Sequence, residues 1–210
     1  MKYRVIGSNS KGNAIIYDNK FMVDCGVPYN RIKPYIKDLE YVFLTHRHND
    51  HFNLSTISSL HSKGIKFVCG EWLKESLNRM GIEPTIVDLN KWYDFGIIRA
   101  SAFKLYHDVE NCGWRLNIDN KKIFHATDTG TLEGISAKGY QLYSIEANYD
   151  EEVMKLKVAE QLENGEFAHG IRSQETHLSI QQANDFIKEN ATDYCEVIEL
   201  HKSNTYGGGK

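Results

Sequence analysis

A short segment rich in histidine and aspartate carries the strongest chemical signal in the sequence. Residues 45–51 read Thr-His-Arg-His-Asn-Asp-His and directly follow the apolar run Tyr41–Leu44. Zinc binds imidazole nitrogens at about 2.0–2.1 Å and carboxylate oxygens at about 2.0–2.2 Å, so ligands on such short side chains must start close together. Four candidate ligands lie within six positions here, a density typical of metal or catalytic sites rather than of a solvated loop. They are His46, His48, Asp50 and His51.

The elements around this segment predict an α/β protein built in layers. Tyr41–Leu44 is too short and too continuously apolar for a surface helix, and it suits a strand buried on both faces. Other strands are predicted over Tyr3–Ile6, Ala14–Tyr17, Phe21–Asp24, Lys66–Cys69, Thr85–Leu89, Gly96–Tyr106, Gly113–Ile118, Lys121–Ala126, Leu142–Ala147 and Cys195–Leu200. Helices are predicted over Tyr29–Leu39 (beginning or kinked at Pro34), Leu54–Lys63, Trp72–Arg79, Asp150–Leu162 and Ser179–Glu189, the last opened by a Ser179 N-cap, with a loop around Gly170. This order favours two sheets packed together with helices outside.

Composition narrows the class of protein further. The chain has 210 residues, of which 41% are apolar, and a formal net charge of −3. We expect one domain over residues 1–206, followed by a flexible tail at 207–210. The four cysteines are scattered without a CxxC pair, which gives no basis for a zinc ribbon or a thioredoxin motif. No apolar run approaches the ~18 residues of a membrane span, so we expect a soluble cytoplasmic protein that has no contact with membranes.

The pattern His46-x-His48-x-Asp50-His51 after an apolar strand resembles the signature of the metallo-β-lactamase superfamily. Two earlier stretches, Gly7-Ser8-x-Ser10-x-Gly12-Asn13 and Val23-Asp24-Cys25-Gly26, resemble the opening strands of its small WalJ-type members. The resemblance covers almost the whole chain. It implies a four-layer αββα sandwich of two mixed sheets with helices outside and a metal site at one edge.

The same resemblance implies three further ligands, each at the end of a later strand. They are His107, Asp128 and His201. His46, His48 and His107 would bind one ion, and Asp50, His51 and His201 the other, with Asp128 between them. Taken alone, His107 is also compatible with a strand-end histidine and Asp128 with an Asx-turn. Two divalent ions, zinc or manganese, would suit hydrolysis, because a pair of ions can activate a shared water and clamp both the attacking and the leaving oxygen.

Two more residues resemble the tRNA 3′-processing endonuclease branch of the superfamily. Glu146 would orient His177, and His177 would donate a proton to the departing oxygen. Each also has a plain structural reading, Glu146 as a strand-end carboxylate exposed to water and His177 as a histidine at a helix N-terminus, where positive charge is disfavoured. The resemblance therefore implies catalytic roles for Asp50, Glu146 and His177. The aspartate at position 128 disfavours a β-lactam hydrolase, whose corresponding residue is often a thiolate.

We therefore expect a binuclear metal-dependent phosphodiesterase acting on nucleic acid or a nucleotide. A nuclease of single-stranded or 5′-ended DNA or RNA is the first hypothesis. A cyclic-nucleotide phosphodiesterase of the kind that viruses use against host signals is the second, and a thioesterase similar to glyoxalase II is a third. Monomer and homodimer both stay open. Lys11, Arg47, Arg115, Arg172 and Lys202 could line a phosphate path, and Trp114 and Tyr149 could stack a base, although each also suits a plain surface or core position.

Overall fold

The computed structural model describes residues 2–165, 169–203 and 205–207. The chain divides into two compact units, Met1–Lys104 and Leu105–Lys210, which are described separately below. The expectation of a single domain over residues 1–206 stays a prediction. Of the predicted tail, residues 208–210 lie outside the described residues.

A six-stranded sheet forms the centre of the first unit. Its strands are β1 (Tyr3–Gly7), β2 (Ala14–Tyr17), β3 (Phe21–Val23), β4 (Tyr41–Phe43), β5 (Lys66–Cys69) and β6 (Thr85–Ile86). They lie side by side in sequence order, antiparallel from β1 to β3 and parallel from β3 to β6. The β2 and β3 side chains are all buried, as expected for continuous apolar runs covered on both faces.

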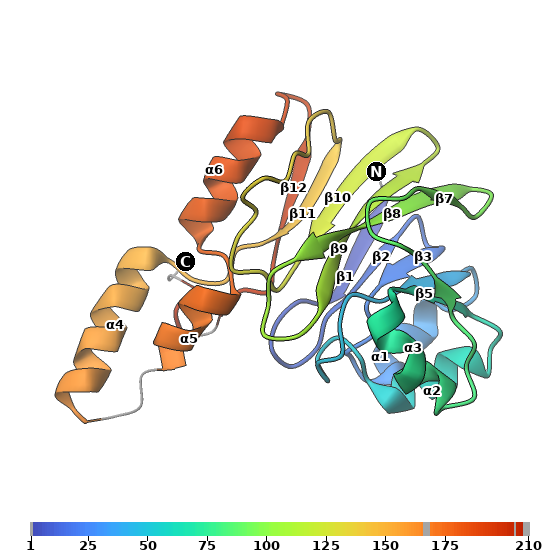
Figure 1. The fold of residues 1–210 in the computed structure, drawn as a ribbon, viewed down its shortest axis with the longest axis horizontal. Coiled ribbons are helices and arrows are strands. Elements are labelled where there is room, and N and C mark those ends of the chain that lie inside the picture. Colours follow the sequence, from blue (N-terminus) through green and yellow to red (C-terminus); the bar gives the residue numbers. More distant parts are fainter. Residues whose placement is uncertain (1, 166–168, 204, 208–210) are drawn as a thin grey trace. The chain divides into compact units, whose positions relative to one another are not determined.

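Helices connect the parallel strands of this unit and pack on its sheet, as Figure 1 shows. They are α1 (Tyr29–Ile32), continued by the 3₁₀ turn Lys33–Tyr35, α2 (Leu54–His61) and α3 (Glu71–Asn78). Pro34 ends α1 early because its ring cannot continue an α-helix. Asn53 caps α2 by accepting a hydrogen bond from Thr56 N. Ile57, Leu60 and Leu73 are buried in one core with the strand residues Val42 and Phe67.

The second unit contains β9 (Asn111–Ile118), β10 (Lys121–Ala126), β11 (Leu142–Glu146) and β12 (Glu196–Leu200). The order is β12-β11-β10-β9, parallel from β12 to β10 and antiparallel between β10 and β9. Strands β7 (Tyr93–Asp94) and β8 (Ile98–Leu105) pair antiparallel with each other. Each sheet mixes parallel and antiparallel strands, as predicted.

The described residues of the second unit form three helices: α4 (Glu151–Glu163), α5 (His169–Thr176) and α6 (Ile180–Asn190). Ser179 caps α6 in a reciprocal box with Gln182, as its sequence position predicted. The loop predicted around Gly170 is wrong, because α5 occupies this stretch. Gly170 serves packing there rather than a turn, since a Cβ on it would lie 2.3 Å from Met154 Sδ on α4.

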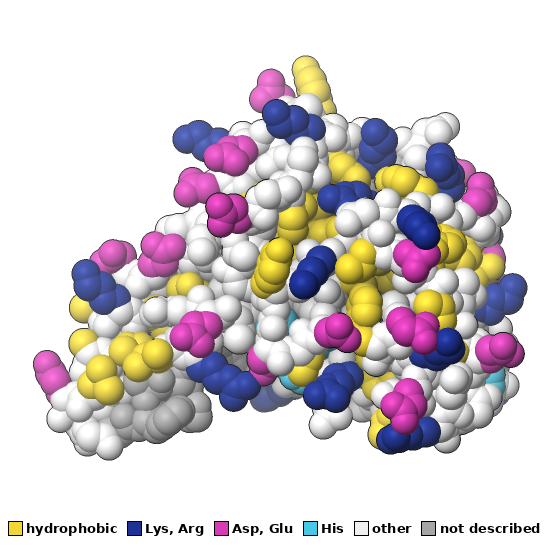
Figure 2. Space-filling model, in the orientation of Figure 1, with side chains coloured by type: hydrophobic (Ala, Val, Ile, Leu, Met, Phe, Trp, Pro, Cys, Tyr) yellow, Lys and Arg dark blue, Asp and Glu magenta, His cyan; other side chains and the backbone are white. Residues whose placement is uncertain are grey.

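Helices α4 and α5 extend away from the β11–β12 side of the sheet (Figure 1). Apolar side chains gather on their surface in Figure 2, and Leu156, Leu162 and Ile171 are exposed there. Within the described residues, no helix is long and apolar enough to cross a membrane.

Candidate metal centre

In the first unit, one buried carboxylate holds two of the predicted ligands. Asp24 Oδ2 accepts a hydrogen bond from His51 Nδ1 at 2.6 Å. The Thr45 hydroxyl donates its single proton to Asp24, with Oγ1 2.9 Å from Oδ2, so this hydroxyl accepts from His46 Nδ1 at 2.9 Å. With both Nδ1 atoms protonated, His46 and His51 each keep a lone pair on Nε2. In this tautomer, Nε2 is the ring atom that could bind a metal.

Asp24 is conformationally strained and electrostatically unusual. Its backbone φ is +58°, a region that non-glycine residues rarely occupy. Burial raises the pKa of its carboxyl group, and the attraction of His51 offsets only part of this effect. Such strain is often found at functional sites, where surrounding contacts over-determine it. Here the Thr45 backbone N–H also donates to Asp24 Oδ1 at 2.9 Å.

The β1–β2 loop fixes the Asp50–His51 segment from a second side. Asn13 N donates to the Asp50 carbonyl at 2.7 Å, and Asn13 Nδ2 lies 2.8 Å from His51 Nε2. Gly26 lets the chain approach even more closely, since a Cβ on it would lie 1.7 Å from Asp50 O. The His46 ring lies 4.8 Å from the His48 ring and 4.2 Å from the His51 ring, centroid to centroid. The predicted ligands of the first unit therefore form one cluster.

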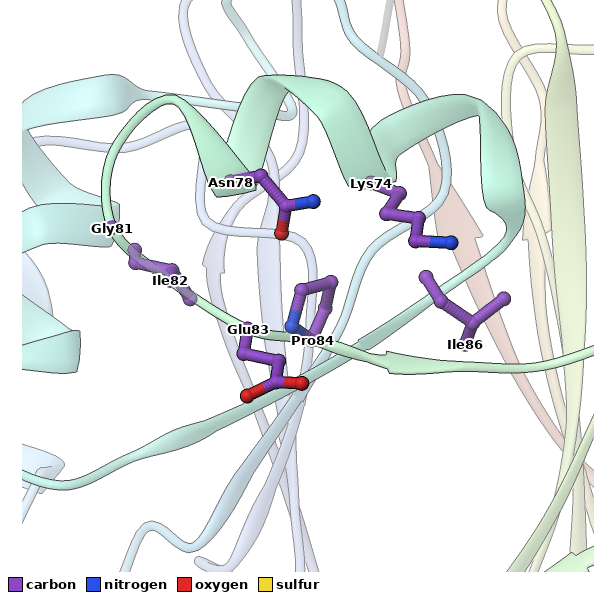
Figure 3. A pocket seen from close by; sticks show the side chains of 7 residues that line it. All are labelled: Lys74, Asn78, Gly81, Ile82, Glu83, Pro84 and Ile86. Atoms are coloured by element: carbon purple, nitrogen blue, oxygen red, sulfur yellow. The ribbon is translucent and has the colours of Figure 1, made fainter.

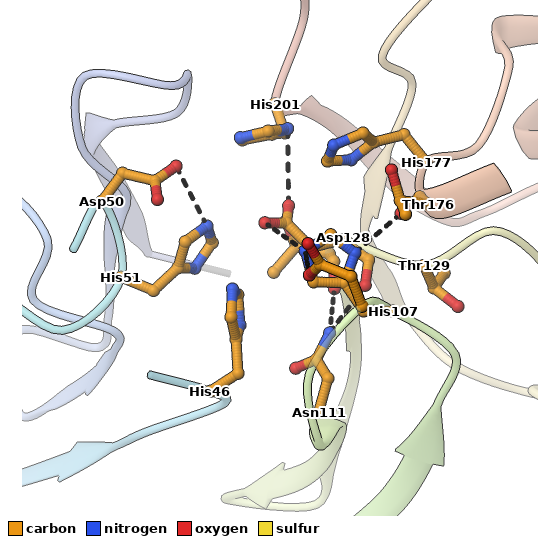
Figure 4. Close-up of polar contacts among 12 residues, drawn as sticks. His46, Asp50, His51, His107, Asn111, Asp128, Thr129, Thr176, His177 and His201 are labelled. Atoms are coloured by element: carbon orange, nitrogen blue, oxygen red, sulfur yellow. Dashed lines mark hydrogen bonds and ion pairs between the residues drawn. The ribbon is translucent and has the colours of Figure 1, made fainter. Parts of the chain in front are cut away.

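In the second unit, Asp128 follows β10 in the left-handed region, with φ +56°. Asn111 Nδ2 donates to the Asp128 carbonyl at 2.6 Å and so holds this turn. The two carboxylate oxygens face different histidines (Figure 4): Oδ2 lies 4.0 Å from His107 Nε2, and Oδ1 lies 3.4 Å from His201 Nδ1. The plain Asx-turn reading does not account for this divided contact.

Glu146 ends β11 as a fully buried carboxylate. Its Oε1 accepts from His177 Nδ1 at 2.6 Å and lies 3.2 Å from His201 Nδ1. Its Oε2 accepts from the Thr129 N–H at 3.0 Å and lies 3.4 Å from the Leu178 N–H. Burial by itself would raise the pKa of Glu146, but its contacts with His177 and His201 lower it. The reading of Glu146 as a solvent-exposed strand end is therefore wrong.

His177 is held in a geometry that favours its protonated form. Burial would lower its pKa, but the Glu146 carboxylate outweighs this effect and raises it. His177 also directly follows the C-terminus of α5, where the helix dipole favours a positive charge. The sequence predicted only the N-terminus of the following helix, α6, next to His177, and did not predict the C-terminus of α5. The His177 side chain keeps 17% of its surface exposed, so part of the ring can be reached.

The other two predicted ligands of this unit are oriented by backbone carbonyls or amides. His107 Nδ1 donates to the Thr176 carbonyl at 3.0 Å, which leaves the lone pair on Nε2. Burial lowers the pKa of His107 and favours the neutral imidazole that binds metal. His201 has φ +51°, and Asn148 Nδ2 donates to its carbonyl oxygen at 2.7 Å.

These donors fit divalent metal ions. Imidazole and carboxylate groups suit zinc, manganese or iron, and three imidazoles present Nε2 lone pairs. In the second unit, one ligand atom from each of four residues lies within 4.8 Å of all the others. They are Asp128, Glu146, His177 and His201.

Sequence reasoning missed the residues that orient these ligands. Asp24 and Asn13 lay in stretches noted only for their resemblance, and Asn111 and Asn148 were not singled out. Their contacts join residues 17 to 53 positions apart, which local pattern cannot reveal.

Several other candidates have plainer positions. Trp114 is fully buried and Tyr149 is 5% exposed, so neither offers a face on which a base could stack. Lys11 and Arg47 are exposed, and Lys202 pairs with Glu199. A separate pocket of about 390 Å³ lies between α3 and β6 and contains no predicted ligand (Figure 3). Its lining residues are Lys74, Asn78, Gly81, Ile82, Glu83, Pro84 and Ile86.

Comparison with known proteins decides the family. A family model described as the beta-lactamase superfamily domain matches residues 19–194. The chain belongs to this superfamily. The predicted membership is therefore confirmed. A search of curated proteins found no match.

Solved structures of the superfamily fold match nearly the whole chain. The metallo-beta-lactamase fold protein YhfI from Bacillus subtilis is 14% identical with a TM-score of 0.75, and the match covers 96% of this chain and 86% of that one. The short form of human tRNase Z is 16% identical with a TM-score of 0.70, covering 97% and 93%. A diphosphatase from the PhnP family is 14% identical with a TM-score of 0.69, covering 98% and 87%. These similarities confirm the predicted metallo-β-lactamase sandwich fold.

Proposed function

We propose that the chain is a metal-dependent phosphodiesterase, and most specifically a nuclease. The observation that carries this proposal is the 2.6 Å hydrogen bond between His177 Nδ1 and the buried Glu146 carboxylate, beside Asp128 and His201. A histidine held in this way can deliver a proton to a leaving alkoxide. The similarity of the fold to tRNase Z and to a PhnP-family diphosphatase is consistent with phosphoester chemistry.

The family pattern assigns His46, His48 and His107 to one ion and Asp50, His51 and His201 to the other. Asp128 would bridge them, which agrees with the way its two oxygens face His107 and His201. Two divalent ions, when bound, lower the pKa of a coordinated water and polarise the phosphoryl group. Zinc and manganese are the metals that we propose, given ligands without sulfur.

The residues of the chain divide the remaining work. Glu146 fixes the Nδ1–H tautomer of His177 and stabilises its positive charge, so Nε2 can carry a proton to the leaving oxygen. After transfer, the neutral imidazole stays in place through the same hydrogen bond. Asp24 keeps His46 and His51 in the tautomer that presents Nε2.

A cyclic-nucleotide phosphodiesterase is the second candidate, and the net charge favours it. A chain with a net charge of −3 lacks the general excess of lysine and arginine that polynucleotide-binding domains usually carry. A cyclic mononucleotide needs no long basic groove.

The test is an activity screen after metal removal and separate reconstitution with zinc and manganese. A 5′-labelled single-stranded oligonucleotide is compared with 3′,5′-cyclic mononucleotides and a thioester, and Asp128→Ala serves as the inactive control. Cleavage of the oligonucleotide alone, lost in Asp128→Ala, is the expected result. Cleavage of cyclic nucleotides alone would replace the nuclease with the second candidate. Thioester hydrolysis that survives His177→Asn would overturn both.

A further inference from the structure

Helix α5 makes direct contact with the candidate site from one side. The Thr176 carbonyl at its C-terminal end accepts the hydrogen bond from His107 Nδ1. Next to it, Gly130 lies so close to the helix that a Cβ would be 2.1 Å from Glu175 O. The last turn of α5 is therefore fixed against the loops that carry His107 and Asp128.

One turn before Thr176, the same helix carries an arginine directed to this site. Arg172 Nη2 donates to Asp108 Oδ2 at 2.6 Å. The other oxygen of Asp108, Oδ1, lies 3.2 Å from His107 Nε2, the ring atom that a metal would use. The guanidinium group is thus two contacts away from the candidate metal ligand. It lies at the rim, because the Arg172 side chain is 74% exposed.

The ion pair between Arg172 and Asp108 can separate at low cost, which would let Arg172 exchange the carboxylate for a phosphate. Exposed pairs of this kind contribute only about 0–1 kcal/mol to stability, so their separation costs the fold little. A guanidinium group matches the spacing of two phosphate oxygens and can bind them in parallel. Asp108 keeps 30% of its side-chain surface exposed, so water can solvate its carboxylate when the arginine turns away.

We propose that Arg172 binds a second phosphate of the substrate, next to the one that is cleaved, and that it leaves Asp108 to do so. The inference rests on the proposed function for the phosphodiester chemistry of the site. It also narrows that function, because a 3′,5′-cyclic mononucleotide has one phosphate only. The substrate class is then a single-stranded oligonucleotide with at least two successive phosphates.

Binding of a 5′-phosphorylated thymidine trinucleotide to the full chain in a chelator tests this without turnover. Arg172→Ala is expected to weaken binding about tenfold or more, as the loss of a hydrogen bond from a charged group implies. The slope of log Kd against log salt should fall by about 0.7, the value for one phosphate contact on a single strand. Lys155→Ala is the control: it removes an exposed cation from neighbouring α4 and should change neither the affinity nor the salt slope. Equal effects of the two variants, no effect of Arg172→Ala, or no binding by the unaltered chain would overturn the inference.

Asp108→Asn gives a second test with the opposite sign. Binding of the trinucleotide should tighten, because the resting partner of Arg172 has lost its charge. This gain in affinity should disappear when Asp108→Asn is combined with Arg172→Ala. A gain that persists in the double variant would contradict the proposal that Arg172 exchanges Asp108 for a phosphate. The proposed function fails separately: a chain that binds the trinucleotide through Arg172 but cleaves no phosphodiester keeps the phosphate contact of Arg172 and loses the phosphodiesterase.

Discussion

The two units present their candidate ligands in contrasting ways. In the first unit, the four ligands come from a single loop after β4, and Asp24 fixes the tautomers of two of them, that of His51 directly and that of His46 through Thr45. In the second unit, His107, Asp128, Glu146 and His201 follow or end four different strands. Each has its own partner, a carbonyl, an amide or a pair of backbone N–H groups.

The contrast suggests that the two clusters have different chemical roles. A contiguous loop held by one carboxylate is suited to providing donors for metal ions, among them Asp50, for which a catalytic role is also predicted. The dispersed cluster also places Glu146 and His177, whose geometry suits proton transfer rather than metal binding alone. We therefore expect variants in the second unit to affect the rate most strongly, and variants in the first unit to affect metal affinity.

The largest effect is expected at His177. His177→Asn should lower kcat about 10²–10⁴-fold, the usual contribution of a positioned general acid. Glu146→Gln should lose a similar factor, because it no longer stabilises the imidazolium. Steady-state rates on the substrate found active measure both variants, with His61→Asn at an exposed position of α2 as the matched control. Undiminished kcat in His177→Asn would end the proton-donor role.

The same pair predicts a pH dependence. Because the pKa of His177 is raised, its proton is kept to higher pH than in a free imidazole. A general acid acts only while protonated, so kcat should stay level below this pKa and fall as the pH rises through it. In His177→Asn the falling limb should vanish from the pH profile. Persistence of the limb would assign it to another group.

Measurements of metal affinity should distinguish Asp24, which supports two candidate ligands, from Asn148, which supports one. Asp24→Asn removes the charge that holds both His46 and His51, which the family pattern assigns to different ions. Both binding steps should weaken about 10–100-fold, as is usual when such supporting contacts are lost. Asn148→Ala removes contacts to His201 alone, so it should weaken only one of the two metal-binding steps. Competition with a chromophoric chelator measures both steps, and an equal response of the two variants would contradict the contrast between the units.

The sequence predicted the first cluster more completely than the second for a physical reason. His46, His48, Asp50 and His51 lie within six positions, so their proximity needs no knowledge of the fold. The partner of this loop was not predictable in the same way. Asp24 reaches His51 across 27 positions through the parallel pairing of β3 with β4, which residue pattern alone does not specify.

In the second unit, the strands and helices α4 and α6 were predicted well, and helix α5 was not. The apolar runs of β10 and β11 marked their own positions, and the Ser179 cap marked the start of α6. Helix α5 was predicted as a loop, because a glycine near its start, taken alone, indicates a break in the helix. Its stability comes instead from packing of Gly170 on α4 and of Glu175 on Gly130, which are tertiary contacts.

The smallest expected effect concerns the two glycines that let the backbone pack behind each cluster. A Cβ at position 26 would lie 1.7 Å from Asp50 O, and one at position 130 would lie 2.1 Å from Glu175 O. Overpacking of this kind costs about 1–3 kcal/mol, and each kcal/mol lowers Tm by about 2–4 °C in a chain of this size.

Gly26→Ala should be the more damaging substitution, because Asp50 O already accepts from Asn13 N and its loop has little freedom to move. Glu175 lies in the last turn of α5, where a small shift is easier to accommodate. Gly81→Ala is the reference for backbone strain alone, since its φ is +73° and nothing lies within 4 Å of the added Cβ. Thermal unfolding of all three variants in a chelator measures the order. A Gly26→Ala Tm no lower than that of Gly81→Ala would show that the loop of the first unit is looser than its contacts indicate.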